Sequence, residues 1–146
     1  MASKAKPLNE ELKKVFFPLV ESKGFVRSRS TDPHFVIFKR STDRGEDVFE
    51  IQWDKYWRPY FVVNFEKCGV NESPWNENGR LQRRRGGSLS CWFSLFPPLL
   101  ERFLNFRWKY TPNEVVRELI EKFPELEEWW LSGTVGHHMY IVGRHA

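Results

Sequence analysis

Four arginines lie close together near the middle of the 146-residue chain, and two glycines follow them directly. Guanidinium groups match phosphate oxygens, and glycines let a backbone approach a phosphate closely, so this pattern favours phosphate binding. Nearby tryptophans can stack on bases. The residues of this nucleic-acid-binding hypothesis are Arg80, Arg83, Arg84, Arg85, Trp75 and Trp92. The alternative interpretation is a long basic loop over 68–87 whose charges are solvated.

Polar side chains also alternate with apolar ones in two neighbouring segments, 47–57 and 60–67. The polar set is Glu50, Gln52, Asp54, Asn64 and Glu66. Paired carboxylates can perform acid–base chemistry when their surroundings separate their pKa values. Such a set is more typical of the wet face of an antiparallel sheet. A polar ligand groove is the alternative interpretation of the same face.

Acidic residues surround a tryptophan pair near the C-terminus. The predicted partner-binding residues are Trp129, Trp130, Glu127 and Glu128. Exposed tryptophans ringed by charge are common interface hot spots. Adjacent residues on a helix point in different directions, so we expect one of the two tryptophans to be partly exposed. The competing interpretation is that both pack on the sheet.

The remaining reactive side chains form no catalytic or metal-binding motif. His34, His137, His138 and His145 lack the spacing of convergent metal ligands. The two cysteines, Cys68 and Cys91, are too few for a disulfide framework, and no nucleophile motif surrounds either one. We therefore expect no catalytic residue, metal or cofactor, and we expect Cys91 to be buried.

Composition indicates one globular domain over 1–146. Hydrophobic residues make up 40% and charged residues 29% of the chain, with a net charge of +4 and a pI of about 9.2. Seven tryptophans and thirteen phenylalanines supply a large aromatic core. No signal peptide is visible and no apolar run approaches the ~18 residues of a membrane span, so the expectation is a cytoplasmic protein without a membrane partner.

Hydrophobic periodicity predicts an α+β fold. A helix is expected over 8–22, bent or broken at Pro18. A short apolar run near 34–40 and period-two alternation near 47–57, 60–67 and 88–96 predict four antiparallel strands. Thr111-Pro112-Asn113-Glu114 is a capping box that starts a helix, Pro124 is expected to restart a second helix, and 138–142 form a last edge strand or a tail. The predicted fold is an N-terminal helix, a four-stranded antiparallel sheet and C-terminal helices packed on one face. The side chains that the sheet is expected to bury are Phe49, Ile51, Trp53, Phe61, Val63, Phe65, Leu89, Cys91 and Phe93.

A helix ending in Ser-Lys-Gly-Phe and the later run FEIQWDKYWRPYFVVNFEKCGV carry a resemblance. The chain resembles, over roughly 8–96, a bacterial domain-of-unknown-function family of short α+β proteins. The matching residues are Gly24, Phe25, Phe61, Val63, Asn64 and Phe65. The resemblance implies a fold and, since some members look like neighbours of toxin–immunity systems, an immunity-like role.

The leading functional hypothesis is that the chain is a non-enzymatic protein-interaction domain with an unknown protein partner. An immunity- or antitoxin-like role is the form of interaction that the resemblance suggests. Nucleic-acid binding through Arg80–Arg85 is the alternative, and an enzyme using the polar sheet face is the third hypothesis. A homodimer formed through a free edge strand is compatible with the predicted sheet.

Overall fold

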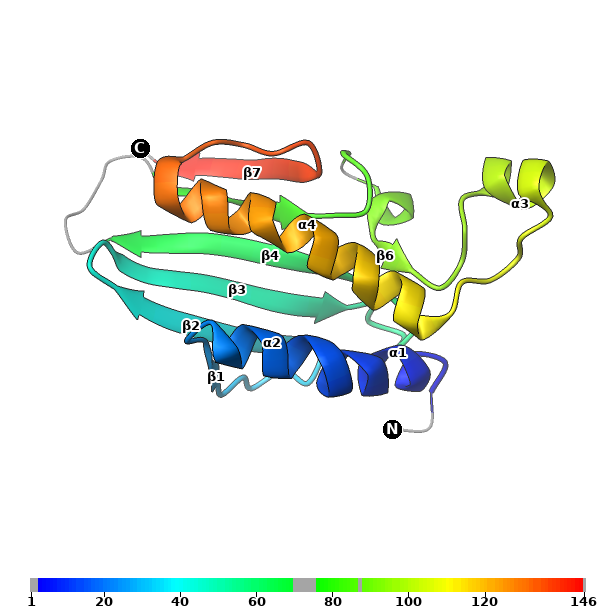
Figure 1. Cartoon of the computed structure of the whole chain (residues 1–146), viewed down its shortest axis with the longest axis horizontal. Coiled ribbons are helices and arrows are strands. Elements are labelled where there is room, and N and C mark those ends of the chain that lie inside the picture. The colour runs from blue at the N-terminus through cyan, green and yellow to red at the C-terminus, as the bar shows by residue number, and fades with distance from the viewer. Residues whose placement is uncertain (1–2, 70–75, 87, 146) are drawn as a thin grey trace.

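A single antiparallel sheet organises the chain in the computed structural model, which describes residues 3–69, 76–86 and 88–145. The strands lie in the order β1-β2-β3-β4-β5-β7, and β6 pairs with β4. Three helices cover one face of the sheet, namely α1 (Lys6–Glu11), α2 (Phe17–Ser22) and α4 (Pro112–Ser132). Helix α3 (Leu99–Asn105) projects away from the sheet (Figure 1). The strand bounds are β1 Val26–Ser28, β2 Phe35–Thr42, β3 Gly45–Trp53, β4 Tyr60–Gly69, β5 Asn76–Leu81, β6 Phe93–Ser94 and β7 Met139–His145.

The centre of the sheet follows the predicted alternation. In β3 and β4, Phe49 lies opposite Phe65 and Ile51 lies opposite Val63. All four side chains are buried on the helix-covered face. The predicted α+β class and antiparallel pairing are therefore confirmed, because every second residue of these strands is large and apolar.

The predicted number of strands was wrong, and so was the long loop over 68–87. Strand β4 continues to Gly69, and β5 pairs with both β4 and β7. The sequence of β5, NENGRL, has one large apolar residue, Leu81, and therefore carries no alternating signal. Its neighbours hold it in the sheet, since Leu81 lies opposite Val63 of β4 and Met139 of β7. The segment 138–142 was predicted to be an edge strand or a tail, and the structure shows the edge strand β7 there.

The strand predicted over 88–96 was also wrong in extent. The chain forms a short 3-10 helix at Leu89–Cys91 and pairs only over the two residues of β6. Cys91 and Phe93 are buried as expected, whereas Leu89 is half exposed. The backbone turns here because the Cys91 carbonyl accepts hydrogen bonds from the backbone N–H groups of Arg83 and Arg84, at 3.0 and 3.3 Å.

The N-terminal helix is continuous but changes its winding before Pro18. It consists of α1 Lys6–Glu11, a π-helical turn Leu12–Phe16 and α2 Phe17–Ser22. Proline lacks an N–H group and collides with the carbonyl four residues earlier, and a widened turn relieves that conflict. The predicted helix and its irregularity at Pro18 are confirmed.

Helix α4, Pro112–Ser132, begins where the capping box predicted. The Glu114 backbone N–H donates to Thr111 Oγ1 at 3.2 Å, and Gly133 ends the helix with a φ of 80°. The helix runs through Pro124 without a restart, so that prediction was wrong. Pro124 lies on the exposed side, and the buried side chains of Phe123 and Leu126 on either side hold the helix against the sheet.

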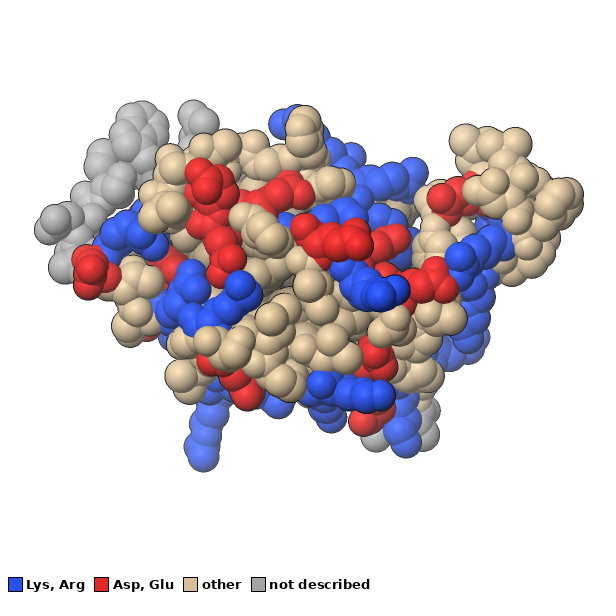
Figure 2. Space-filling view, in the orientation of Figure 1, with Lys and Arg blue, Asp and Glu red and all other residues tan. Residues whose placement is uncertain are grey.

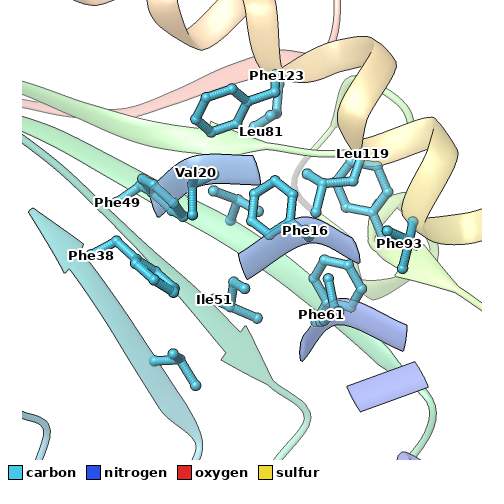
Figure 3. Close-up of a cluster of buried hydrophobic side chains, with 14 of the residues drawn as sticks. Phe16, Val20, Phe38, Phe49, Ile51, Phe61, Leu81, Phe93, Leu119 and Phe123 are labelled. Carbon is cyan, nitrogen blue, oxygen red and sulfur yellow. The ribbon is translucent and has the colours of Figure 1, made fainter. Parts of the chain in front are cut away.

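Aromatic side chains join the helical layer to the sheet. Phe49 has five aromatic neighbours with ring centroids 5.0–6.3 Å away, which are Phe16, Phe25, Phe38, Phe123 and Trp130. Figure 3 shows Phe16 and Phe123 approaching this strand from the two helices. Such pairs contribute about 0.5–1.5 kcal/mol each beyond the burial of their area.

Replacing Phe49→Ala should lower the free energy of unfolding by about 3–5 kcal/mol, because the substitution leaves a cavity between both layers. Urea denaturation followed by circular dichroism measures the change. The exposed Tyr56→Ala is the control and should change the same quantity by less than about 0.5 kcal/mol. Equal effects of the two substitutions would contradict the central role of Phe49.

Candidate interaction surface

The arginine run does not form one cluster in the structure. Arg80 lies on the sheet face opposite the helices, where its Nε donates to Asn64 Oδ1 at 3.1 Å. Arg84 and Arg85 are exposed. Arg83 is instead 9% exposed, and its guanidinium lies 4.7 Å from the centre of the Tyr110 ring. The phosphate clamp predicted from all four residues therefore does not exist as a single site.

Arg83 fastens α4 to the end of β5. Its Nε donates to Glu118 Oε2 at 2.8 Å, and its Nη2 donates to the Ser94 carbonyl at 2.5 Å. The ion pair with Glu118 neutralises a guanidinium that has lost most of its water. This arginine is a structural residue, since its donors are directed into the protein.

The tryptophans of the nucleic-acid hypothesis are not available as a stacking surface. Trp92 is 5% exposed and packs edge to face against Tyr60, with Arg80 over its ring at 5.8 Å. The prediction of a base-stacking role for Trp92 was therefore wrong. Trp75 lies outside the described residues.

Both tryptophans of the C-terminal pair are buried, so the expectation that one is partly exposed was wrong. Trp129 packs against Phe65 at 4.7 Å, and Trp130 Nε1 donates to the Glu66 carbonyl at 3.0 Å. The helix crosses the sheet so that one ring faces β4 and the other reaches Phe25, 5.5 Å away. The partner-binding interpretation loses its exposed anchors.

The two acidic residues beside the tryptophan pair also bind within the chain. Glu127 lies 3.4 Å from Lys23 Nζ and 3.6 Å from Arg40 Nη1. Glu128 is exposed and accepts a hydrogen bond from Ser132 Oγ at 2.8 Å. Figure 2 shows acidic side chains over α4, alternating with basic ones on the neighbouring elements. This surface is charged, and neither tryptophan of the pair is exposed on it.

The uncovered face of the sheet carries Glu50, Gln52 and Asn64 of the predicted polar set as a connected network. Asn64 Nδ2 donates to Glu50 Oε1 at 3.0 Å and to Gln52 Oε1 at 2.8 Å. A groove of about 310 Å³ lies over these strands, lined by Glu50, Asn64, Glu66, Asn78, Arg80 and Val142 among others. Burial raises the pKa of Glu50, the hydrogen bond from Asn64 opposes that shift, and the nearby Glu66 adds to it. Ligand binding in this groove stays a prediction.

Asp54 of the predicted polar set is not part of this hydrogen-bond network. Its carboxylate is 4% exposed and binds the turn between β3 and β4, where it accepts from Arg58 Nε at 2.9 Å and from the Tyr56 backbone N–H at 3.0 Å. These bonds, led by the one from Arg58, lower the pKa of Asp54. The residue follows the end of β3, so its side chain closes a turn and does not extend the row.

An unexpected apolar surface lies on the excursion 96–109, which we call the arm. Helix α3, Leu99–Asn105, is described throughout and has no buried residue. The exposed fractions on the arm are 67% for Leu99, 70% for Leu100, 69% for Phe103, 68% for Leu104, 81% for Phe106 and 61% for Trp108. Figure 2 shows the arm as a mainly uncharged projection at the right of the molecule. Large contiguous exposed apolar patches mark interaction sites in soluble proteins.

Tyr110 holds the base of the arm closed. Its backbone N–H donates to the Leu95 carbonyl at 2.7 Å, and its hydroxyl donates to Glu101 of α3. Burial, with the hydrogen bond to Glu101, raises the pKa of Tyr110 to about 12. The arm is therefore a closed loop attached between β6 and α4, in the size range of compact surface loops.

The arm also has internal contacts that define its shape. Arg102 Nε donates to the Pro97 carbonyl at 2.9 Å, and Phe103 packs edge to face on Trp108 at 6.3 Å. Phe106 ends the helix in the left-handed region, with a φ of 53°. A non-glycine residue in this region needs support from its surroundings.

Sequence reasoning missed this surface although a signal was present. Leu99, Leu100, Phe103 and Leu104 follow helical spacing. That spacing identifies an apolar face but does not tell whether the chain itself covers the face.

The described part of the chain also lacks features of a membrane span and of a metal centre. None of its helices combines the length and the apolar character that crossing a bilayer requires. No group of three or more histidine, cysteine, aspartate or glutamate side chains among the described residues is placed to hold a metal ion.

Neighbouring arginines should differ sharply in their effect on stability. Arg83→Ala should lower the free energy of unfolding by about 2–4 kcal/mol, because Glu118 and the Ser94 carbonyl lose their buried donor. Arg84→Ala and Arg85→Ala are the matched controls and should change it by less than about 0.5 kcal/mol. Chemical denaturation of the three variants compares them. A mild effect of Arg83→Ala would show that its ion pair is not structural.

Glu50→Gln should stabilise the protein at neutral pH by about 0.5 kcal/mol. The folded state raises the pKa of Glu50, so it favours the neutral carboxyl group, and stability is lost as pH rises through the folded pKa. Glutamine stays neutral and keeps the oxygen that accepts from Asn64. Thermal unfolding at pH 7 and pH 4 should show a stabilisation that shrinks at the lower pH. The exposed Glu10→Gln serves as the control, and a stabilisation equal at both pH values would refute the explanation.

Comparisons of the chain with protein-family models, with curated proteins and with solved structures found no match. The resemblance to the bacterial family therefore stays a prediction. The function of the surface has to be inferred from its own geometry.

Proposed function

We propose that this protein is a protein-interaction domain that binds its partner through the arm. The observation that carries the proposal is the exposure of six large apolar side chains on 99–108, each by 61% or more. The hydrophobic effect disfavours such a surface in water by roughly 25 cal/mol for each Å² of apolar area, so covering it is favourable.

The core of the domain does not need the arm. The helices bury their apolar faces on the sheet, and the main hydrophobic cluster contains no residue of α3. The apolar side chains of α3 are therefore not buried in the hydrophobic core of their own chain. An ordered element whose apolar side chains face solvent matches the way short helices dock in apolar grooves of partner proteins.

The contacts at the base of the arm support a docking role. Tyr110 fixes both ends of the loop, and α3 is held by Glu101 and Arg102. An arm that is already ordered loses less conformational entropy on binding than a disordered segment. The family resemblance implies an immunity-like role, and such a role would be one form of protein binding through the arm.

Nucleic-acid binding draws less support from the geometry. Arg83 is committed to Glu118, and Arg80 donates to Asn64 on the uncovered sheet face. Arg84 and Arg85 are left as exposed bases of the original set, and two adjacent exposed arginines do not make an oriented phosphate-binding groove.

Photo-crosslinking in cells tests the proposal. A benzoyl-phenylalanine introduced at Phe103 or at Phe106 should give a discrete crosslinked protein adduct, because these side chains would lie inside the interface. The same group at Val26, which is 70% exposed on the edge strand β1, is the control and should give no such band. Loss of the adduct in a Leu100→Ser/Leu104→Ser background is also expected.

The proposal fails if neither arm position gives a protein adduct, or if Val26 gives the same adducts as the arm. Circular dichroism of the serine variant has to show an unchanged fold. That result is expected, because the main hydrophobic cluster contains neither leucine.

A further inference from the structure

We infer that the partner of the arm is a second copy of this chain, with the two arms packed against each other around a two-fold axis. This inference rests on the proposed function, since it names the partner of the same surface. Three features of the arm and its surroundings support it.

The first feature is a groove beside the arm. It has a volume of about 260 Å³ and lies between the arm and the body, lined mainly by Tyr60, Leu89, Phe96, Pro97, Pro98 and Leu99. Leu89 is half exposed there. One continuous surface thus carries both a projection and an apolar hollow. A two-fold interface requires this kind of self-complementary patch, because each subunit offers the same surface to the other.

The second feature is the distribution of charge. Identical charges near a two-fold axis repel each other, so a dimer surface has to neutralise its own charged groups. On the arm, Glu101 accepts from Tyr110 and Arg107 pairs with Glu114 of α4. Arg102 donates to the Pro97 carbonyl and lies over the Phe96 ring at 5.5 Å. Arg107 is thus paired, Glu101 and Arg102 carry opposite charges and bind neutral groups, and Lys109 is the fourth charge of the arm. Outside the Arg107–Glu114 pair, the arm therefore keeps one negative and two positive charges, a net charge of +1, as its apolar side chains approach their copies.

The third feature is the available area. A buried aromatic side chain removes about 150–250 Å² from solvent. Phe103, Phe106 and Trp108 expose 69%, 81% and 61% of their surfaces, which corresponds to roughly 300–500 Å². Three leucines and the groove add to this sum. A stable interface takes about 800 Å² from each partner, so the arm and groove provide a large part of one subunit's share.

Sedimentation equilibrium of the purified full chain tests the inference. The wild type should sediment as a dimer that dissociates on dilution, with a dissociation constant on the order of 10 μM or tighter. Phe103→Ser/Leu104→Ser should raise that constant at least about 100-fold, because two anchors are lost. Val26→Ser/Val142→Ser removes two exposed side chains from β1 and β7, the strands at the two edges of the sheet, and this control should dimerise like the wild type.

The inference is overturned if the wild type is a monomer at about 100 μM, well above the expected constant, or if the arm variant dimerises as tightly as the wild type. Crosslinking of the purified protein from benzoyl-phenylalanine at Phe106 gives a second readout. Its adduct should map to 89–108 of the second chain, and an adduct only at another place would contradict the two-fold arrangement.

The same measurements separate this inference from the proposed function. A monomeric wild type whose arm crosslinks a different protein in cells refutes the dimer and keeps the interaction function. A monomeric wild type whose arm yields no protein adduct refutes both. Flotation of a monomeric wild type with lipid vesicles, lost in the arm variant, would assign the arm to a membrane surface and also refute both.

Discussion

The contact between Phe49 and the aromatic side chains of both helices is the constraint on which the structure depends. Phe16 from the N-terminal helix and Phe123 from α4 meet the same ring on β3. Both helices are therefore committed to one face of one sheet. The other face stays open to solvent, and its polar network around Asn64 suits that position.

This two-layer arrangement leaves the arm without a layer of its own. The chain leaves the sheet after β6 and returns only at α4, and the Leu95–Tyr110 hydrogen bond closes the excursion. The apolar side chains of α3 thus lie outside the hydrophobic cluster that both helices complete. Their exposure follows from the topology, and the proposed partner would cover them. The buried Arg83 contributes by fixing α4, and hence the return point of the arm, to the end of β5.

The sequence predicted the parts of the fold that have a regular period. Alternation around Phe49 and Phe65 identified the central strands, and the capping box at Thr111 placed the start of α4. Strand β5 escaped because its neighbours, and not its own residues, hold it in the sheet. The prediction that the helix restarts at Pro124 was wrong for a related reason, because tertiary packing outweighed the low helix propensity of proline.

The candidate site was harder to predict than the fold. Arg83 and Trp130 have side chains typical of binding surfaces, yet both serve the interior. The spacing of Leu99, Leu100 and Phe103 did indicate an apolar face, but exposure depends on where the rest of the chain lies. Hydrophobic periodicity identifies an apolar face of a helix but does not show whether other elements cover that face. The exposure of the arm is therefore visible only in the three-dimensional structure.

Hydrogen–deuterium exchange of the arm across a dilution series tests most directly whether a second copy of the chain covers the arm. Backbone amides of 99–109 should exchange slowly at high protein concentration and faster on dilution, while those of β3 and β4 stay protected throughout. Fast exchange of the arm at every concentration would contradict this view, because no second copy would then cover it. Slow exchange that persists far below the dissociation constant would also contradict it, because the arm would then be packed on its own body.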